Sequence, residues 1–264
     1  MYTITCEHLT KTFESDRGPV SPINDLSLTF KQGTINAVIG QSGCGKTTLL
    51  RMIAGLDTPT VGQISYKGDG HDPRVSIVFQ EPRLFPWFTV RENIRLSVRH
   101  LPQEEQTRLV DEALSLVGLE HVAEAMPAEL SGGMAQRVGL ARALCPKPDV
   151  LLLDEAFSAL DALTRTRLYE EFMAIHAAVP MTTVLITHDV TEAVLLATKI
   201  YRLGTGCLEA EYEVPFAYPR RLSSPGVAQL SDEFFTQIQT PLMWKPAFLK
   251  ARLKFKPSVS AWKM

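Results

Sequence analysis

The segment that most constrains the fold of this chain is a glycine-rich stretch at residues 40–47, which reads GQSGCGKT. It fits the pattern G-x-x-x-x-G-K-[ST], in which glycines let the backbone curl so that successive N–H groups point at phosphate oxygens. An apolar run at residues 35–39 predicts a strand before it, and residues 48–54 predict a helix after it. Because a helix N-terminus attracts anions, this strand–loop–helix unit predicts a nucleotide-phosphate site in an α/β core.

Individual roles follow from the chemistry of this loop. We expect Lys46 to give a positive charge to the β- and γ-phosphates and the Thr47 hydroxyl to ligate Mg²⁺. A thiol beside Lys46 at the positive end of a helix should have a lowered pKa, so the sequence also predicts a reactive Cys44. Further nucleotide contacts, chiefly from backbone N–H groups, are expected at Gly40, Ser42, Gly43, Cys44, Gly45 and Thr48.

Composition places the chain among ordinary globular proteins, with 45% hydrophobic and 21% charged residues in 264. The net charge of −2 gives no argument for nucleic acid as a partner. No apolar stretch approaches the roughly 18–20 residues that span a bilayer, and the N-terminus does not resemble a signal peptide. We therefore expect a cytoplasmic location. The cysteines lack metal-type spacing and are expected to be free thiols: Cys6, Cys44, Cys145 and Cys207.

Short apolar runs with helical segments between several of them predict a mostly parallel sheet covered by helices. The runs lie at residues 35–39, 75–79, 150–153, 183–186 and 200–203.

Two regions depart from this pattern. Residues 1–9, 26–30 and 63–66 read as strands of an N-terminal antiparallel β-subdomain. Residues 82–146 lack strand patterns, and a helical period at 104–117 indicates an α-helical subdomain inserted into the core.

Polar residues come after several of the predicted core strands, at the edge where ligands of open α/β folds bind. Asp154 is expected to hold Mg²⁺ together with Thr47, and Glu155 is the expected general base for a hydrolytic water. His188 is placed to act on the γ-phosphate or the water. Gln80 is expected to contact Mg²⁺ or the attacking water. Paired acids at a strand end are often merely solvated, but behind a phosphate-binding loop the functional interpretation is favoured.

A second candidate anion site lies at residues 130–137, where Ser131, Gly132 and Gly133 precede an alanine-rich helical run. The simple interpretation is a serine N-cap. The alternative is a site that presents N–H groups and a hydroxyl to phosphate. One triphosphate needs only one such site, so a second indicates the nucleotide of a partner subunit.

This ordered set of segments resembles the ATP-binding subunit of ABC transporters over roughly residues 1–220. The corresponding motifs are Walker A at 40–47, the Q-loop at Gln80, the signature at 130–134, Walker B at 150–155, the D-loop at 158–161 and the switch histidine at His188. Within that family, residues 81–87 and 161–165 look most like the nitrate/sulfonate/taurine importers of bacteria.

The resemblance implies ATP and Mg²⁺ as cofactors and an adenine that stacks on Phe13, although a core or edge-strand aromatic is the alternative for Phe13. The chain departs from the family at Ala135, Ala156 and Cys44, none of which removes a group that touches phosphate or metal. The residues implied to meet the nucleotide of a second chain are Ser131, Gly132, Gly133 and Gln136.

The function implied is ATP hydrolysis at a dimer interface, coupled to uptake of a small anionic or sulfonate-like solute. A second copy or a homologous subunit, membrane permease subunits and, indirectly, a periplasmic binding protein are the expected partners, which would hold the chain at the cytoplasmic face of the inner membrane. The alternatives are a soluble ABC-type ATPase that is not coupled to transport and a protein that only binds nucleotide. The solute itself stays open.

We expect an ATP-binding domain at residues 1–240 and a separate tail at 241–264. From residue 244 onward the tail carries six Lys or Arg and no acid, interleaved with aromatic residues. It either lies on an anionic membrane surface or packs on the domain or frays in solvent.

Overall fold

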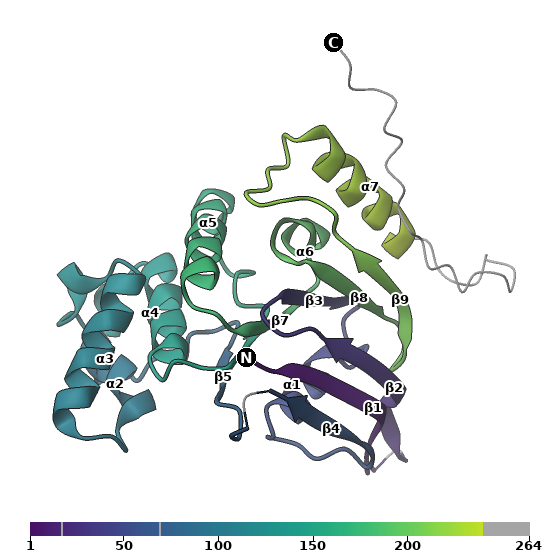
Figure 1. Ribbon diagram of the computed structural model, residues 1–264, viewed down its shortest axis with the longest axis horizontal. Helices are drawn as coiled ribbons and strands as arrows, with labels where there is room; N and C mark the ends of the chain where they lie inside the picture. Colours follow the sequence, from purple (N-terminus) through teal and green to yellow (C-terminus); the bar gives the residue numbers. More distant parts are fainter. Residues whose placement is uncertain (17, 69, 240–264) are drawn as a thin grey trace, which may run out of the picture.

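The computed structural model describes residues 1–16, 18–68 and 70–239. The prediction for the tail at 241–264 lies outside the described residues. Within them, a mixed, mostly parallel sheet forms the centre of the molecule, and β9 runs antiparallel to β8 at one edge (Figure 1). In spatial order its strands are β5 (Val75–Val78), β6 (Val150–Asp154), β7 (Thr182–Thr187), β3 (Ile35–Gly40), β8 (Lys199–Leu203) and β9 (Leu208–Glu213).

The inner strands β6, β7 and β3 are buried on both faces, which explains why they are nearly continuous apolar runs rather than alternating sequences. Side chains at successive positions of β6 point to opposite faces, so Leu151 and Leu153 join one hydrophobic cluster and Val150 and Leu152 the other. The first cluster includes buried residues of the helical segments within 90–144 and 162–196, and the second includes α1 (Lys46–Ile53) and the N-terminal strands.

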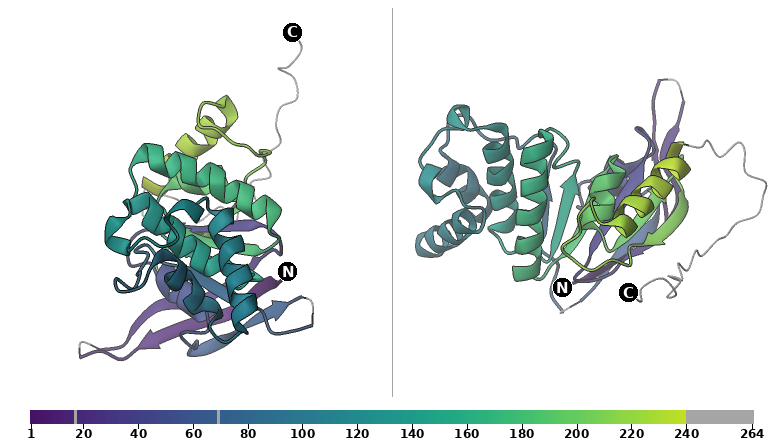
Figure 2. Two further views of the ribbon diagram at one scale, coloured as in Figure 1. Left: turned by 90° about the vertical axis from the view of Figure 1, so that its left-hand side faces the viewer. Right: turned by 90° about the horizontal axis from the view of Figure 1, so that it is seen from above.

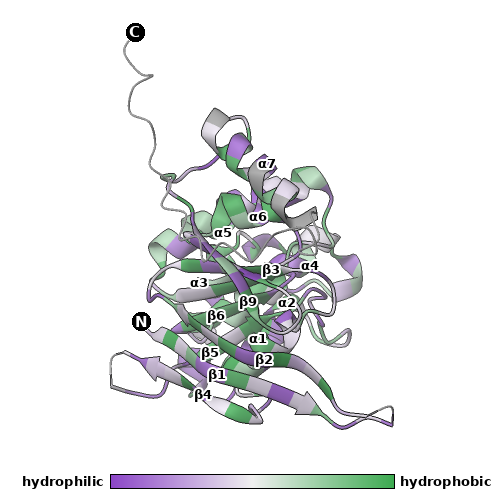
Figure 3. Cartoon of the chain, turned by 90° about the vertical axis from the view of Figure 1, so that its right-hand side faces the viewer, coloured by the Kyte–Doolittle hydropathy of each residue, from purple (hydrophilic) through white to green (hydrophobic). Residues whose placement is uncertain are grey.

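The N-terminal strands form a three-stranded antiparallel sheet in the order β2 (Val20–Phe30), β1 (Thr3–Phe13) and β4 (Val61–Lys67). Hydrophobic and hydrophilic residues alternate along much of β1 and β2, as expected for strands with one face on the core (Figure 3). β1 and β2 are longer than the sequence predicted. Their pairing continues through register irregularities as far as Phe13 and Val20, which ordinary strand patterns do not mark.

The chain between β5 and β6 is helical and lies to one side of the molecule, away from the three-stranded sheet (Figure 2). Thr89 and Glu92 form a capping box that begins the first of these helices. The segments are α2 (Val90–Arg95), η1 (Leu96–Val98), α3 (Gln103–Leu116), η2 (Glu120–Val122), η3 (Pro127–Glu129) and α4 (Gly132–Leu144).

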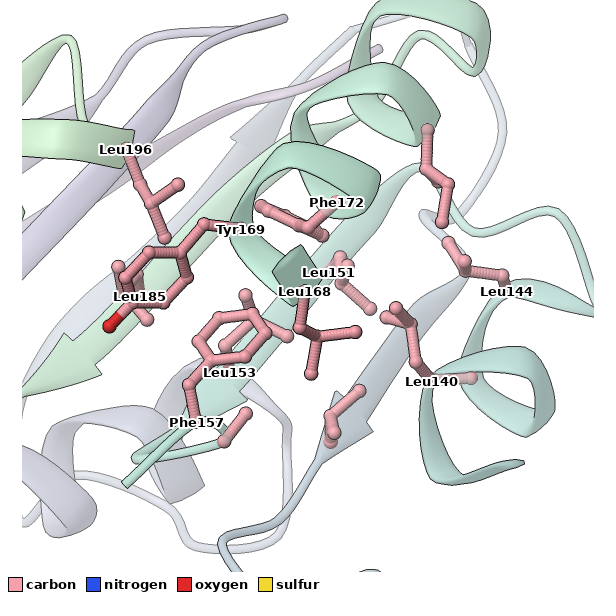
Figure 4. Packing of buried hydrophobic residues seen from close by; sticks show 14 of the residues in the cluster. Leu140, Leu144, Leu151, Leu153, Phe157, Leu168, Tyr169, Phe172, Leu185 and Leu196 are labelled. Atoms are coloured by element: carbon pink, nitrogen blue, oxygen red, sulfur yellow. The ribbon is translucent and has the colours of Figure 1, made fainter. Parts of the chain in front are cut away.

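Three more helices, α5 (Ala162–Ala178), α6 (Val190–Leu196) and α7 (Pro225–Gln239), complete the described chain. The ring of Phe157 packs against those of both Tyr169 and Phe172, with centroids 5.3 and 5.8 Å away, and anchors α5 to the sheet (Figure 4). Among the described helices, none combines the length and apolar character needed to cross a bilayer. The predicted fold class, a P-loop α/β core with an antiparallel sheet and inserted helices, is confirmed.

Candidate nucleotide site

Four parallel strands bring the sequence motifs to one edge of the central sheet. The order β5-β6-β7-β3 makes the segments after these strands neighbours, because parallel strands end on the same side. Asp154 ends β6, His188 comes directly after β7 and the glycine-rich loop comes after β3. Gln80 lies two residues beyond the last residue of β5 rather than directly at its end, and it is exposed.

The loop between β3 and α1 has backbone geometry that only glycine tolerates. Gly45 has φ +102°, and a Cβ there would lie 2.2 Å from the carbonyl oxygen of Pro22. Gly45 is also the N-cap of α1 and supplies no side-chain hydrogen bond, so the N–H groups of the first turn face outward for an anion. Lys46 is buried, and its Nζ donates to the carbonyl oxygens of Gly40 at 2.9 Å and Gln41 at 3.0 Å. Its ammonium group therefore lies along the inner side of the loop.

A hydroxyl and a carboxylate meet beside this loop. Thr47 Oγ1 lies 3.5 Å from Asp154 Oδ1. Burial, with the adjacent charge of Glu155, raises the pKa of the Asp154 carboxyl above its usual range. A nearby cation would stabilise the ionised form of this partly buried carboxyl. Carboxylate and hydroxyl oxygens are ligands that suit Mg²⁺.

Glu155 and His188 form the second half of the site. Oε2 of Glu155 lies 3.1 Å from Nδ1 of His188. Glu155 adopts a left-handed backbone conformation with φ +48°, and its N–H donates to the carbonyl of Ile186 at 2.9 Å. Such strain in a residue without glycine's freedom is typical of functional positions, because the surrounding structure must hold it.

In the segment at 131–136, Ser131 forms the helix N-cap that was one of the two interpretations of its sequence. Ser131 is exposed and caps α4 by accepting from the N–H of Met134 at 3.2 Å. In the described part of the chain no hydrogen bond joins it to the glycine-rich loop. Gln136, which was expected to contact nucleotide, is buried in the single chain, and its amide donates to the carbonyl of Phe79 at 3.2 Å. Gln136 instead ties α4 to the segment before Gln80.

Phe13, the residue expected to stack on adenine, ends β1 and is 42% exposed. The ammonium of Lys11 lies 4.9 Å from its ring centroid. An exposed ring at a strand end leaves a face accessible for stacking, so the position is compatible with that role.

The prediction of a lowered pKa for Cys44 is wrong. The thiol is buried against Gly40, and burial raises its pKa, outweighing the lowering effect of Lys46. The sequence pattern identified the charge and the helix end but not the desolvation.

We expect maleimide to label Cys207 rather than Cys44 in the folded protein. Cys207 is exposed and Cys44 is buried with a raised pKa, so the reactive thiolate is scarce at Cys44. Mass spectrometry of peptides after brief labelling measures this, with urea-unfolded protein as the control in which both thiols react. Equal labelling of the two thiols in folded protein would contradict the assignment.

A buried polar group that the sequence did not predict lies behind His188. Thr187 Oγ1 donates to Oε2 of Glu192 at 2.6 Å, and the N–H of Asp189 donates to Thr187 Oγ1 at 2.9 Å. The D-x-x-E spacing of Asp189 and Glu192 could have predicted the start of α6, but not that the glutamate is buried. Burial raises the pKa of Glu192 to about 8.

This shift predicts that Glu192 destabilises the protein as pH rises. Between its ordinary pKa of 4.5 and about 8 the folded state holds a proton that the unfolded state has lost. The free energy of unfolding therefore falls with pH, by up to about 1.4 kcal/mol per unit. Glu192→Gln, which is uncharged at all pH values, should gain stability relative to the native chain from pH 5 to pH 8. Urea denaturation measures the difference, and a difference independent of pH would contradict the assignment.

Comparison with known proteins agrees with this geometry. The family model described as "ABC transporter" matches residues 23–158. The chain is 48% identical over 211 residues to a bicarbonate transport ATP-binding protein, CmpC, of Synechococcus elongatus, covering 77% of this chain but only 32% of that relative. It is 42% identical over 237 residues to the nitrate import ATP-binding protein NrtD of the same species, covering 84% and 86% of the two chains.

A solved structure gives the same result for the fold. The ATP-binding cassette MJ0796, in a dimeric post-hydrolysis state bound to ADP and Pi, matches with a TM-score of 0.71 and 29% identity over 81% of this chain and all of that one. The family match covers about half of the chain, and the nitrate import relative is covered over most of its length. The chain therefore belongs to the ABC transporter family, as its motifs predict.

Proposed function

We propose that this chain hydrolyses Mg·ATP and supplies the energy for a bacterial importer of a small anion. The observation that carries the proposal is the pairing of Glu155 Oε2 with His188 Nδ1 at 3.1 Å beside the Thr47–Asp154 pair. A carboxylate held next to an imidazole, near a phosphate loop and a metal ligand set, is what hydrolysis of a triphosphate requires.

Each residue has a defined task. The N–H groups of the loop and Lys46 bind the phosphates, and Phe13 stacks on the adenine. Thr47, Asp154 and Gln80 hold Mg²⁺, which when bound neutralises charge on the phosphates. Glu155 accepts a proton from the attacking water, and His188 orients that carboxylate and adds a hydrogen bond to the charge that develops.

The site is completed by a second copy of the chain. Ser131, Gly132 and Gly133 lie at an exposed helix N-terminus, whose N–H groups and hydroxyl suit a phosphate. Since they do not bond to their own loop, we assign them to the partner's nucleotide. ATP contacted from both sides favours the closed dimer, and hydrolysis removes that contact.

Coupling to import is supported by the relatives, which are named for nitrate and bicarbonate transport. Both are small anions, so we propose a solute of this class. It is delivered by a periplasmic binding protein to permease subunits, which keep this chain at the cytoplasmic membrane face. We assign the ATP-binding domain to residues 1–240, with residues 82–146 as its inserted helical subdomain.

Exposed aromatic side chains favour the transport role over a soluble ATPase. Trp87 is 65% exposed and Phe85 41% exposed, shortly after Gln80 in the chain. Their rings lie 5.5 Å apart and form an apolar surface that suits a helix of a membrane subunit.

Reconstitution with the membrane permease subunits that co-purify with this chain tests the proposal. We expect solute and binding protein to stimulate ATP hydrolysis in proteoliposomes. Trp87→Ala should reduce this stimulation and leave basal hydrolysis unchanged. Leu56→Ala, at an exposed apolar residue elsewhere, is the matched control. Hydrolysis that no permease or solute affects would favour the soluble ATPase.

A further inference from the structure

Two segments are attached directly to the backbone of Glu155. The first is the end of β7 with the turn that carries His188, because the N–H of Glu155 donates to the carbonyl of Ile186. The second is the stretch 158–161 before α5, because Ser158 Oγ donates to the carbonyl of Glu155 at 2.8 Å. Any movement of one segment relative to the other therefore acts on the position of the Glu155 carboxylate.

Asp189 fixes the turn after His188. One carboxylate oxygen, Oδ1, caps α6 by accepting from the N–H groups of Thr191 at 2.8 Å and Glu192 at 3.3 Å. The other, Oδ2, pairs with NH1 of Arg165 at 3.3 Å. The turn is thus held from two directions, by its own helix and by α5.

Arg165 reaches both segments at once. Its NH2 donates to the carbonyl of Leu160 at 2.8 Å while NH1 pairs with Asp189. A planar guanidinium with donors in a fixed fork sets the distance between the two partners, which a single point charge does not do.

The same turn of α5 touches the segment that we assign to the partner's nucleotide. A Cβ on Gly133 would lie 2.7 Å from the Thr164 methyl group, so the two helices approach closely there. Further along, Arg137 of α4 pairs with Glu171 of α5 at 2.7 Å. α4 and α5 are therefore joined at two places.

We propose that Arg165 is a positioning residue that links His188 in one nucleotide site to Gly133 and Ser131 in the other site of the dimer. Closure around the partner's nucleotide displaces the start of α5, and Arg165 passes that displacement to the His188 turn. This inference rests on the proposed function, since it assumes that His188 and Glu155 act on bound ATP.

The contacts around Arg165 allow its positioning role to be separated from folding. The side chains of Arg165 and Asp189 are each 29% exposed, and partly exposed ion pairs contribute little to stability. Asp161 caps α5 through Leu163 and Thr164, so α5 keeps its start without the guanidinium. Asn at position 189 can still cap α6.

The experiment measures kcat and KM for Mg·ATP in Arg165→Gln, Asp189→Asn and the double variant of the full chain. We expect each single change to lower kcat by about tenfold to a hundredfold while KM stays within about twofold, because geometry is altered and binding is not. The kcat of the double variant should be no lower than that of the less active single variant, since both changes break the same link. Arg167→Gln, exposed on the same helix, is the matched control and should retain native kcat.

If Arg165→Gln does not fold, Arg165→Lys replaces it, because lysine keeps the charge but cannot bridge both partners. Native kcat in the Arg165 variant, or losses that multiply in the double variant, overturns the proposal. His188→Ala separates this failure from failure of the proposed function. An inactive His188→Ala beside a native Arg165→Gln refutes only the link, whereas native activity in both refutes the assigned site.

Discussion

Glu155→Gln is expected to bind ATP as the native chain does and to lose hydrolysis by about 10²–10⁴-fold. The amide has the size of the carboxylate and can still meet Nδ1 of His188, which lies 3.1 Å from Oε2, but it cannot take a proton from water. The phosphate loop and the Thr47–Asp154 pair are unchanged by the substitution. The variant should therefore accumulate as an ATP-bound dimer, detected by gel filtration with ATP beside an assay of phosphate release.

Two variants control this result. Lys46→Ala should weaken nucleotide binding itself, because the ammonium group lies along the inner side of the loop. Glu170→Gln, at an exposed position of α5, should keep native turnover. Turnover near the native rate in Glu155→Gln would show that another group accepts the proton.

The fold, and the position of the motifs close together at one edge of the sheet, could be predicted because both depend on local sequence patterns. An apolar run precedes Asp154, His188 and the glycine-rich loop, and parallel strands bring the residues at and beyond their carboxyl ends to one edge of the sheet. Asp154, His188 and the glycine-rich loop were therefore expected to be neighbours before any contact was known.

Burial is what the expectations for Cys44 and Gln136 left out. The pKa of Cys44 was predicted from a neighbouring charge and a helix end, and the nucleotide contact of Gln136 from the family resemblance, but both side chains are buried against residues far away in the chain. Leu203 of β8 approaches Gly40 beside Cys44, and Phe79 accepts from Gln136. A pattern of residue types does not predict this burial, because tertiary packing determines how far each group is removed from water.

The contact between Arg165 and Asp189 could not be predicted from the sequence for a related reason. The sequence marks Asp161 and Asp189 as helix caps, which is correct, but a cap uses only part of a carboxylate's capacity. The second oxygen of Asp189 can pair with a side chain from another helix. Only the fold determines which side chain that is.

Ser131→Arg is expected to abolish hydrolysis while the single chain still binds ATP. Ser131 is exposed and bonds to its own helix rather than to its own phosphate loop, so an arginine there leaves that loop intact. In a dimer the long side chain would occupy the space of the partner's phosphate. Fluorescent-nucleotide binding and phosphate release measure the two properties separately.

Ser131→Ala is the comparison variant: it removes the hydroxyl, and with it a cap of α4 that contributes about 1 kcal/mol to helix stability, but it leaves the space of the partner's phosphate open, so hydrolysis should fall less than in Ser131→Arg. Native hydrolysis in Ser131→Arg would contradict a site made by two chains.

A mixture of Ser131→Arg with Lys46→Ala gives the sharper result. In a mixed dimer, the intact loop of the first chain meets the intact Ser131 of the second, so one complete site forms from two inactive proteins. Recovery of hydrolysis on mixing is expected only if the nucleotide lies between two chains, because no site within one chain is repaired by mixing.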